Sequence, residues 1–133
     1  EPFLLASMLE LVIAQRLVRR ICNKCKESVP KKYDDIKKNI PNIVDFLDKN
    51  NDFFEGKGCE ACNFTGYKGR IAIYQFICVS AEIKDLILKN PSTREIWELA
   101  KAQGAKSLFE DGIEKVKSGI TTIEELMRIA PPY

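Results

Sequence analysis

The sequence predicts an α+β fold that is mostly helical, and three observations lead to this prediction. A long apolar stretch over residues 3–21 has the spacing of a helix. Two C-x-x-C pairs lie 33 residues apart and are expected to hold together an insertion with short strands. Three helix-capping patterns divide the C-terminal part into short helices. We therefore expect a four-cysteine insertion between a long N-terminal helix and a small all-helical C-terminal subdomain.

Residues 3–21 are expected to form one helix that is packed on more than one side. Apolar residues recur at positions i, i+3 and i+4 and cover most of the circumference over the first three turns. Charged residues interrupt the stretch, so we do not expect a membrane span. Arg16, Arg19 and Arg20 emerge at the C-terminal end, where cations suit the negative end of the helix dipole. We expect solvated charges there; a contact with phosphate or another subunit stays open, as does the role of Arg70.

Composition and charge are those of an ordinary soluble globular chain. Of the 133 residues, 45% are hydrophobic and 30% are charged, and the formal net charge is +2. Four thiolates and one divalent cation would bring this charge close to zero, so nothing indicates a polyanionic partner. Five cysteines without a secretory signal fit a reducing cytosol better than a secreted disulfide framework. The sequence has no initiator methionine and opens directly in an expected helix, so we interpret it as a piece of a longer protein.

Cys22, Cys25, Cys59 and Cys62 are the candidate metal ligands. Two residues between paired cysteines let a tight turn aim both sulfurs at one point, and two such turns supply the four tetrahedral ligands of a structural zinc. The sequence contains no histidine, so the ligand set would be all cysteine, a closed shell without a position for a reactive water. Iron bound by the same four sulfurs stays open. Cys78, isolated in an apolar run, is expected to be a small buried side chain.

Thiol redox chemistry is the alternative use of a C-x-x-C pair. It needs a strand before the pair and a helix that opens at it, whose dipole lowers the pKa of the first thiol. Here Cys22 follows the C-terminal end of the expected helix, where the dipole has the opposite sign. We therefore favour a metal site over a thiol oxidoreductase.

The segment around and between the cysteine pairs is expected to add small elements. Two short helices split at Pro41 are expected over residues 31–50, and a short strand at 53–55. This segment is too short to bury a core alone, so the metal would hold it in place. Glycines beside the cysteines, Gly58 and Gly66 among them, allow the positive φ that turns backbone N–H groups toward sulfur.

Residues 70–79 are the best strand in the chain, because they are rich in β-branched and aromatic side chains and carry few charges. From Ser80 onward we expect four short amphipathic helices, the first of them capped by Ser80 itself. The patterns from Ser92 to Glu95, from Ser107 to Glu110 and from Thr121 to Glu124 match the capping box and open the other three. Glu124 then serves a cap, and Glu125 beside it is expected to be a solvated helix charge.

Residues that common catalytic sites need are missing from the sequence. The absence of histidine removes Ser-His-Asp and Cys-His catalysis. There is no phosphate-binding G-x-x-x-x-G-K-[ST] loop and no G-x-G-x-x-G pattern. Taken alone, the chain is expected to catalyse nothing.

Longer motifs around the cysteines resemble a known family. The run LVIAQRLVRRICxxC extends from Leu11 to Cys25, and GCxxCNxTGYxGRxxIY extends from Gly58 to Tyr74. A tail, GAKSLxxDGxxKVxxGITT, begins at Gly104. Together these motifs closely resemble the C-terminal part of the type II secretion and type IV pilus assembly ATPases, over nearly the whole chain.

The resemblance implies cytoplasmic, hexameric motors that have a RecA-like ATPase core and drive pilus or pseudopilus assembly at the inner membrane. It implies that residues 1–21 are the last helix of that core, 22–69 a tetracysteine zinc-binding subdomain, 70–79 a strand that returns toward the core, and 80–133 a helical C-terminal subdomain. ATP and Mg²⁺ would bind only in the parent protein, because the family's Walker motifs would lie upstream. The partners would be other subunits of a homohexamer and inner-membrane platform components.

Other interpretations stay open beside this resemblance. A zinc-ribbon-like interaction module, for instance for nucleic acid, is suggested by the expected short hairpins and by lysines near the cysteines. The near-neutral charge and the interleaved acidic residues argue against it, so we expect no nucleic-acid partner. The sequence also leaves open whether the parent motor serves a pilus or a secretion system.

Overall fold

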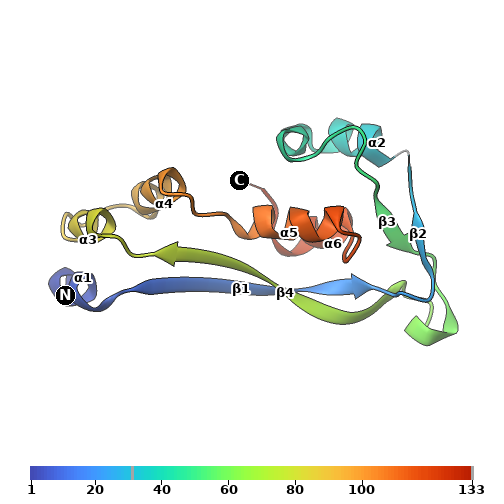
Figure 1. Ribbon diagram of the computed structural model, residues 1–133, viewed down its shortest axis with the longest axis horizontal. Helices are drawn as coiled ribbons and strands as arrows, with labels where there is room; N and C mark the ends of the chain where they lie inside the picture. Colours follow the sequence, from blue (N-terminus) through green and yellow to red (C-terminus); the bar gives the residue numbers. More distant parts are fainter. Residues whose placement is uncertain (31, 133) are drawn as a thin grey trace. The chain divides into compact units, whose positions relative to one another are not determined.

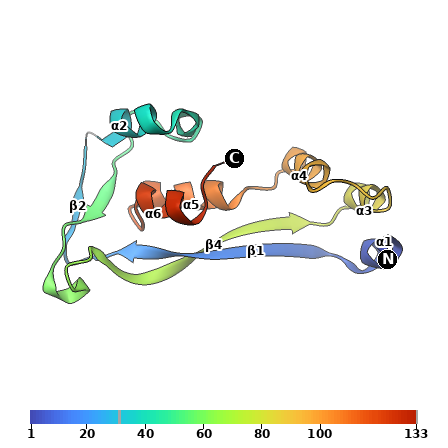
Figure 2. The same ribbon diagram turned by 180° about the vertical axis from the view of Figure 1, so that it is seen from behind.

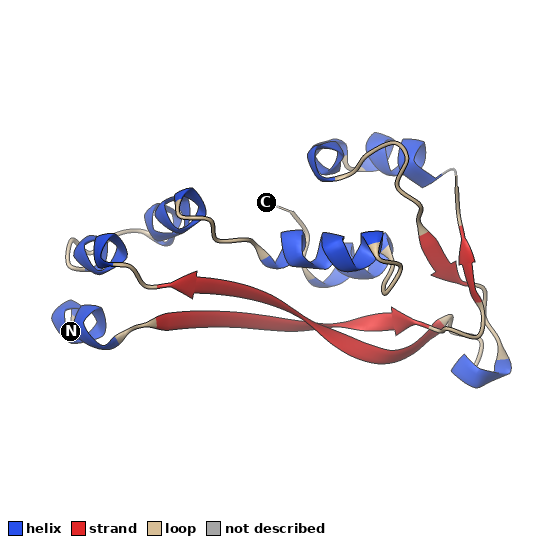
Figure 3. Ribbon diagram, in the orientation of Figure 1, coloured by secondary structure: helices blue, strands red, loops and turns tan. Residues whose placement is uncertain are grey.

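The structure is a computed structural model that describes residues 1–30 and 32–132, the side chain of Lys32 excepted. Its elements are α1 (Pro2–Met8), β1 (Leu11–Ile21), β2 (Lys26–Ser28), α2 (Lys32–Asn39), the 3-10 helix η1 (Pro41–Phe46), β3 (Phe54–Gly56), the 3-10 helix η2 (Glu60–Cys62), β4 (Tyr67–Cys78), α3 (Ala81–Ile87), α4 (Thr93–Ala102), α5 (Leu108–Lys117) and α6 (Ile123–Ile129). Helices and strands are both well represented (Figure 3), which confirms the α+β class. Contacts group the chain into two compact units: unit 1 is Glu1–Gln15 with Tyr74–Ser107, and unit 2 is Arg16–Ile73 with Leu108–Tyr133.

The expected long helix over residues 3–21 is wrong beyond its first turns. α1 ends at Met8, and from Leu11 onward the same stretch forms β1. β1 pairs with β4, and the two strands run in opposite directions (Figures 1 and 2). A stretch so dense in apolar residues fits both the helical period and the alternation of a strand. Its valines and isoleucines favour the strand once a partner strand is available. No helix in the described part of the chain is long and apolar enough to cross a membrane.

β4 contains the strand predicted at 70–79 but begins earlier, at Tyr67. Ile73 is its only fully buried residue, because a two-stranded ribbon covers few of the side chains that alternate along it. Cys78, expected to be buried, is exposed for this reason.

Arg16, Arg19 and Arg20 were expected to be solvated at a helix end, but all three lie on β1. Arg16 and Arg20 are exposed, whereas Arg19 pairs with the buried Glu125. Arg70, whose role stayed open, is exposed on β4.

Unit 1 has a small core of its own. Val79, Ile83 and Ala100 are buried in it, and partly buried side chains such as Trp97 pack around them. Its helices begin as the sequence predicts. The Ser80 hydroxyl accepts the N–H of Ile83 at 3.2 Å and caps α3. Ser92 and Glu95 form both halves of the predicted capping box at the start of α4.

Unit 2 has one core that the cysteine insertion shares with the last two helices. β2 and β3 form a two-stranded antiparallel sheet in which Glu27 lies opposite Glu55. The buried side chains of the insertion meet those of α5 and α6, together with Val18 of β1 and Ile73 of β4. The core residues are Val18, Ile36, Ile43, Leu47, Phe53, Ile73, Phe109, Ile113, Val116, Ile123, Leu126 and Ala130. The insertion therefore has no separate core, in agreement with its shortness, and α5 and α6 supply much of the apolar surface that covers it.

α6 begins one residue later than the sequence predicts. Its N-cap is Thr122, whose hydroxyl accepts the N–H of Glu125 at 3.1 Å, and not Thr121 with Glu124. The Thr121 hydroxyl instead donates to the backbone carbonyl of Arg19 at 2.8 Å. A contact with a distant strand therefore takes Thr121 out of the cap and moves the start of the helix by one position.

The shared core makes a prediction about cooperativity. Phe53 of the insertion is 2% exposed, so Phe53→Ala should lower the free energy of unfolding by about 3–5 kcal/mol. Hydrogen exchange should show that the amides of α5 and α6 lose protection together with those of α2. Phe3→Ala removes a ring that is 69% exposed and serves as the control, with little expected change. Full protection of α5 and α6 in Phe53→Ala would contradict a shared core.

Candidate metal centre

The four predicted cysteines converge on one point within unit 2. Cys22 directly follows β1, Cys25 precedes β2, and Cys59 and Cys62 lie at the two ends of the short turn of η2. Their Sγ atoms all lie within 4.8 Å of one another, and they are the group of potential metal ligands found among the described residues. Three Sγ–Sγ distances, Cys22–Cys59, Cys25–Cys62 and Cys59–Cys62, are each 3.8 Å. Zn–S bonds of about 2.3 Å in a tetrahedron would separate neighbouring sulfurs by about 3.8 Å.

Backbone N–H groups point at the sulfurs, as expected from the glycines beside the cysteines. The N–H of Gly58 donates to Cys25 Sγ at 3.3 Å, and the N–H groups of Cys59 and Gly66 donate to Cys62 Sγ at the same distance. Gly58 and Gly66 have φ of 101° and 81°, in the left-handed region that favours glycine. Such donors stabilise negative charge on sulfur, which is the form that binds a metal.

The thiols differ in how readily they lose a proton. Burial raises the pKa of Cys25 to about 12, helped by the neighbouring thiols and opposed by the Gly58 N–H. Burial also raises the pKa of Cys62, but the N–H groups of Cys59 and Gly66 and the nearby thiols outweigh it and lower the value to about 6. The two shifts have opposite directions within one hydrogen-bonded cluster, and a bound cation would favour deprotonation of its thiols.

The structure changes one argument against thiol redox chemistry. Cys22 follows a strand and not a helix end, so the expected unfavourable dipole is not present. The strand β2 follows Cys25, however, so no helix opens at this pair to lower the thiol pKa as redox sites require. The convergence of all four sulfurs, at distances too long for S–S bonds, favours a metal site.

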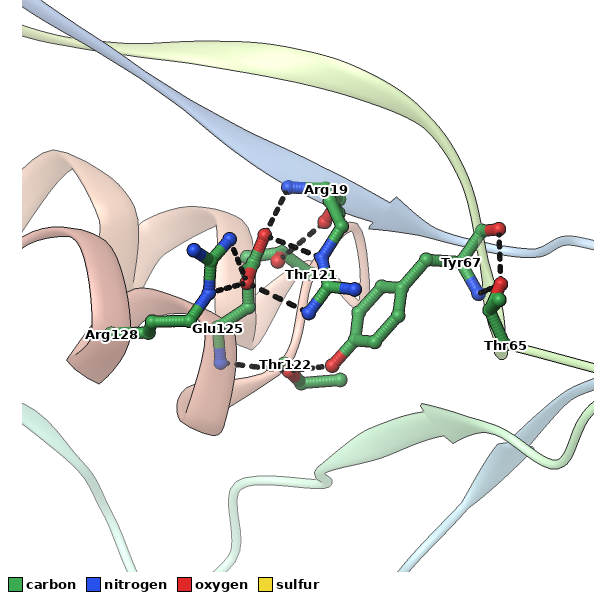
Figure 4. A network of polar contacts seen from close by, with 7 residues as sticks. All are labelled: Arg19, Thr65, Tyr67, Thr121, Thr122, Glu125 and Arg128. Carbon is green, nitrogen blue, oxygen red and sulfur yellow. Dashed lines mark hydrogen bonds and ion pairs between the residues drawn. The ribbon is translucent and has the colours of Figure 1, made fainter.

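A polar network that the sequence does not reveal joins β1 to α6 (Figure 4). Glu125, expected to be solvated, is 1% exposed. Its carboxylate accepts the backbone N–H of Arg19 at 2.7 Å and the guanidinium of Arg19 at 3.0 and 3.2 Å. The Arg128 guanidinium donates to it at 2.8 Å. The spacing of Glu125 and Arg128 by three residues was the only available signal, because the partner on β1 is more than one hundred residues away.

The same contacts cover the outer edge of β1 at its C-terminal end, around Arg19 and Ile21. The Arg19 N–H bonds Glu125, the Arg19 carbonyl accepts from Thr121, and the Ile21 N–H donates to the Ile120 carbonyl at 2.8 Å. Unpaired groups on a strand edge would otherwise remain available for pairing with another chain. The loop from α5 to α6 thus serves as the neighbour of β1 on that side.

Comparisons with known proteins show similarity to proteins of secretion and pilus machines over nearly the whole chain. The family model described as "Type II/IV secretion system protein" matches residues 1–128. The chain is 39% identical over 127 residues to the type IV pilus assembly ATPase PilB of Thermus thermophilus, covering 96% of this chain and 14% of that protein. It is 36% identical to the type II secretion system ATPase E of Vibrio cholerae and to the type II secretion system protein HxcR of Pseudomonas aeruginosa, covering 97% of this chain in both cases and 25% and 23% of those proteins.

The chain therefore belongs to the type II/IV secretion system protein family, as its motifs suggest. It spans only about a seventh to a quarter of the length of these relatives.

The buried carboxylate predicts a pH dependence. Burial raises the pKa of Glu125, but the hydrogen bonds from Arg128 and Arg19 and the charge of Arg19 lower it from 4.5 to about 2. Because the folded pKa lies below the unfolded one, the contribution of about 3 kcal/mol is complete above about pH 4.5 and is lost as the pH falls toward 2.

Glu125→Gln should therefore be less stable than the unsubstituted chain at pH 7, and the difference should shrink toward pH 2. Urea unfolding of both proteins at several pH values measures this difference. Other acid-sensitive groups contribute almost equally to both stabilities, so their contributions cancel in the difference. Glu124→Gln, in an exposed position of the same helical turn, is the matched control. A difference that does not vary with pH would argue against a charged Glu125 in the folded chain.

Proposed function

We propose that this chain is the C-terminal part of a hexameric ATPase that powers type IV pilus assembly or type II protein secretion. The family match over residues 1–128 carries the proposal. In this function the chain contributes a structural metal site and contacts to other subunits and partners, and the chemistry of ATP hydrolysis belongs to the rest of the parent. ATP and Mg²⁺ would bind there, because this sequence has no phosphate-binding loop.

The proposed metal is Zn²⁺, held by Cys22, Cys25, Cys59 and Cys62. The Sγ spacing, the N–H donors and the four-sulfur ligand set support this assignment. When bound, the ion supplies a tetrahedral cross-link and neutralises the thiolates. With all four positions filled by protein, none is left for a substrate, which supports a structural role. Iron would fit the same sulfurs and is the alternative metal.

The domain organisation is also a proposal. We assign residues 1–21 to the ATPase core, now as α1 and β1, 22–69 to the metal-binding subdomain, 70–79 to the returning strand, and 80–133 to the helical subdomain. Exposed apolar side chains on α1 and on the unit 1 parts of β1 and β4 support the first assignment. They are Phe3, Leu4, Leu5, Met8, Leu11, Val12, Ile13, Tyr74 and Phe76. Exposed apolar residues in this number are typical of an interface, and the proposed neighbour is the remainder of the parent.

The proposed setting is the cytoplasmic face of the inner membrane, where the motor would assemble as a homohexamer on platform components of the machine. No nucleic-acid partner is proposed, because the net charge is only +2. The alternative function is a zinc-ribbon-like interaction module. Steep salt dependence of nucleic-acid binding would favour this alternative.

The metal assignment can be tested by elemental analysis of the purified chain. We expect one zinc per chain, and we expect Cys59→Ser to lose it, because three sulfurs cannot complete the shell. Cys78→Ser is the matched control, since Cys78 is exposed and stands outside the cluster. Structural zinc contributes on the order of 10–16 kcal/mol, so Cys59→Ser should also unfold unit 2, including α5 and α6. Metal-free chain that keeps its circular dichroism would contradict a structural role.

The parent activity can be tested by comparing two proteins. The 133-residue chain should not hydrolyse ATP, whereas the full-length protein should. In the full-length protein, Cys59→Ser should abolish pilus or pseudopilus assembly and Cys78→Ser should leave it intact. Hydrolysis of ATP by the isolated chain, or normal assembly with Cys59→Ser, would contradict the proposed division of roles.

A further inference from the structure

Gly66 connects the two cysteine pairs through its backbone. Its N–H donates to Cys62 Sγ at 3.3 Å, and its carbonyl accepts the N–H of Cys22 at 2.9 Å. Its backbone also passes close to that of Gly56. A side chain at either position would collide with the backbone of the other glycine. The position of Gly66 is therefore fixed by the sulfur cluster on both sides.

Tyr67, the next residue, reaches the N-terminal end of α6 (Figure 4). Its hydroxyl lies 2.7 Å from the hydroxyl of Thr122, the residue that caps α6. The guanidinium of Arg19 lies over its ring, 4.1 Å from the centroid, and donates to the carboxylate of Glu125. Tyr67 thus contacts both groups that hold the first turn of α6: the cap and the arginine partner of the buried carboxylate.

Thr65 ties the backbone of Tyr67 back to the cluster. Its hydroxyl lies 2.7 Å from the carbonyl of Cys62 and accepts the N–H of Tyr67 at 3.2 Å. A continuous path of direct contacts therefore runs from Cys62 through Thr65 and Gly66 to Tyr67, and from Tyr67 to Thr122 and Arg19.

We propose that metal binding at the four cysteines positions the N-terminal end of α6 through Tyr67, and that Tyr67 in return strengthens metal binding. The inference rests on the metal binding proposed above. Tyr67 is a positioning residue, because its side chain contacts Thr122 and Arg19 and not the sulfurs. Coupling between two sites is reciprocal, so an interaction that metal strengthens at α6 must strengthen metal binding by the same factor.

The turn before Gly66 explains why this path would depend on the metal. Asn63 and Phe64 both have positive φ, 53° and 60°, a conformation that costs free energy for a bulky side chain such as phenylalanine. Without a cation that holds Cys59 and Cys62, this turn can relax and carry Gly66 and Tyr67 with it. The hydroxyl contact of Tyr67 is short and directional, so a shift of about 1 Å is enough to break it.

The expected effect can be measured as a zinc dissociation constant, by competition with a chelator. Tyr67→Phe keeps the ring and removes the hydroxyl, and it should raise the dissociation constant about three- to tenfold, as the loss of one hydrogen bond implies. In Thr122→Ala the same contact is missing, so Tyr67→Phe should add little to it. Tyr74→Phe, an exposed tyrosine of unit 1, should leave the dissociation constant unchanged.

A general loss of stability needs its own control. Ile113 lies in the unit 2 core on α5, and Ile113→Val removes one methyl group from that core. Urea unfolding measures how much free energy of unfolding each variant loses. For the same loss of this free energy, Tyr67→Phe should raise the zinc dissociation constant clearly more than Ile113→Val. An equal effect of the two variants, or effects of Tyr67→Phe and Thr122→Ala that simply add, would overturn the coupling. An unsubstituted chain that binds no zinc would instead overturn the proposed metal site, and the coupling with it.

Discussion

The cysteine insertion carries too few apolar residues to bury a core by itself, and much of unit 2 follows from this constraint. Its buried side chains, Ile36, Ile43, Leu47 and Phe53, are covered by α5 and α6, which lie more than fifty residues further along the chain. The four sulfurs fix the two ends of the insertion on the other side. The insertion is therefore held between a cysteine cluster and a pair of helices, and it depends on both.

Glu125 joins α6 to β1 by polar contacts within the same unit. Burying a carboxylate is unfavourable unless its oxygens are well paired, and here two guanidinium groups and one backbone N–H satisfy it. Apolar packing alone would tolerate several positions of α6 against β1, whereas a buried charge tolerates few. We infer that Glu125 contributes to the register between α6 and β1 as much as to the stability of unit 2.

The parts of the fold that local chemistry determines could be predicted from the sequence. The ligand set follows from two residues between paired cysteines, and the caps at Ser80 and Ser92 follow from side chains that bond within one turn. The prediction of a helix over 3–21 was wrong because its apolar pattern fits a helix and a strand equally well. Pairing with β4, which lies some fifty residues away, decides for the strand. The start of α6 and the burial of Glu125 depend on Arg19, again a distant partner. Cys78 was misplaced because burial on a strand depends on what covers it.

The shared core also sets an order of events during synthesis of the chain. A ribosome makes the four cysteines before the residues from Phe109 to Ala130, yet the core that covers the insertion needs the latter. Contacts between segments so far apart in sequence form slowly, and their partners remain exposed until then. The nascent insertion therefore emerges with uncovered apolar side chains, and it can reach its final packing only after α5 and α6 have left the ribosome. Early capture of a cation by the thiols would protect this segment during the interval.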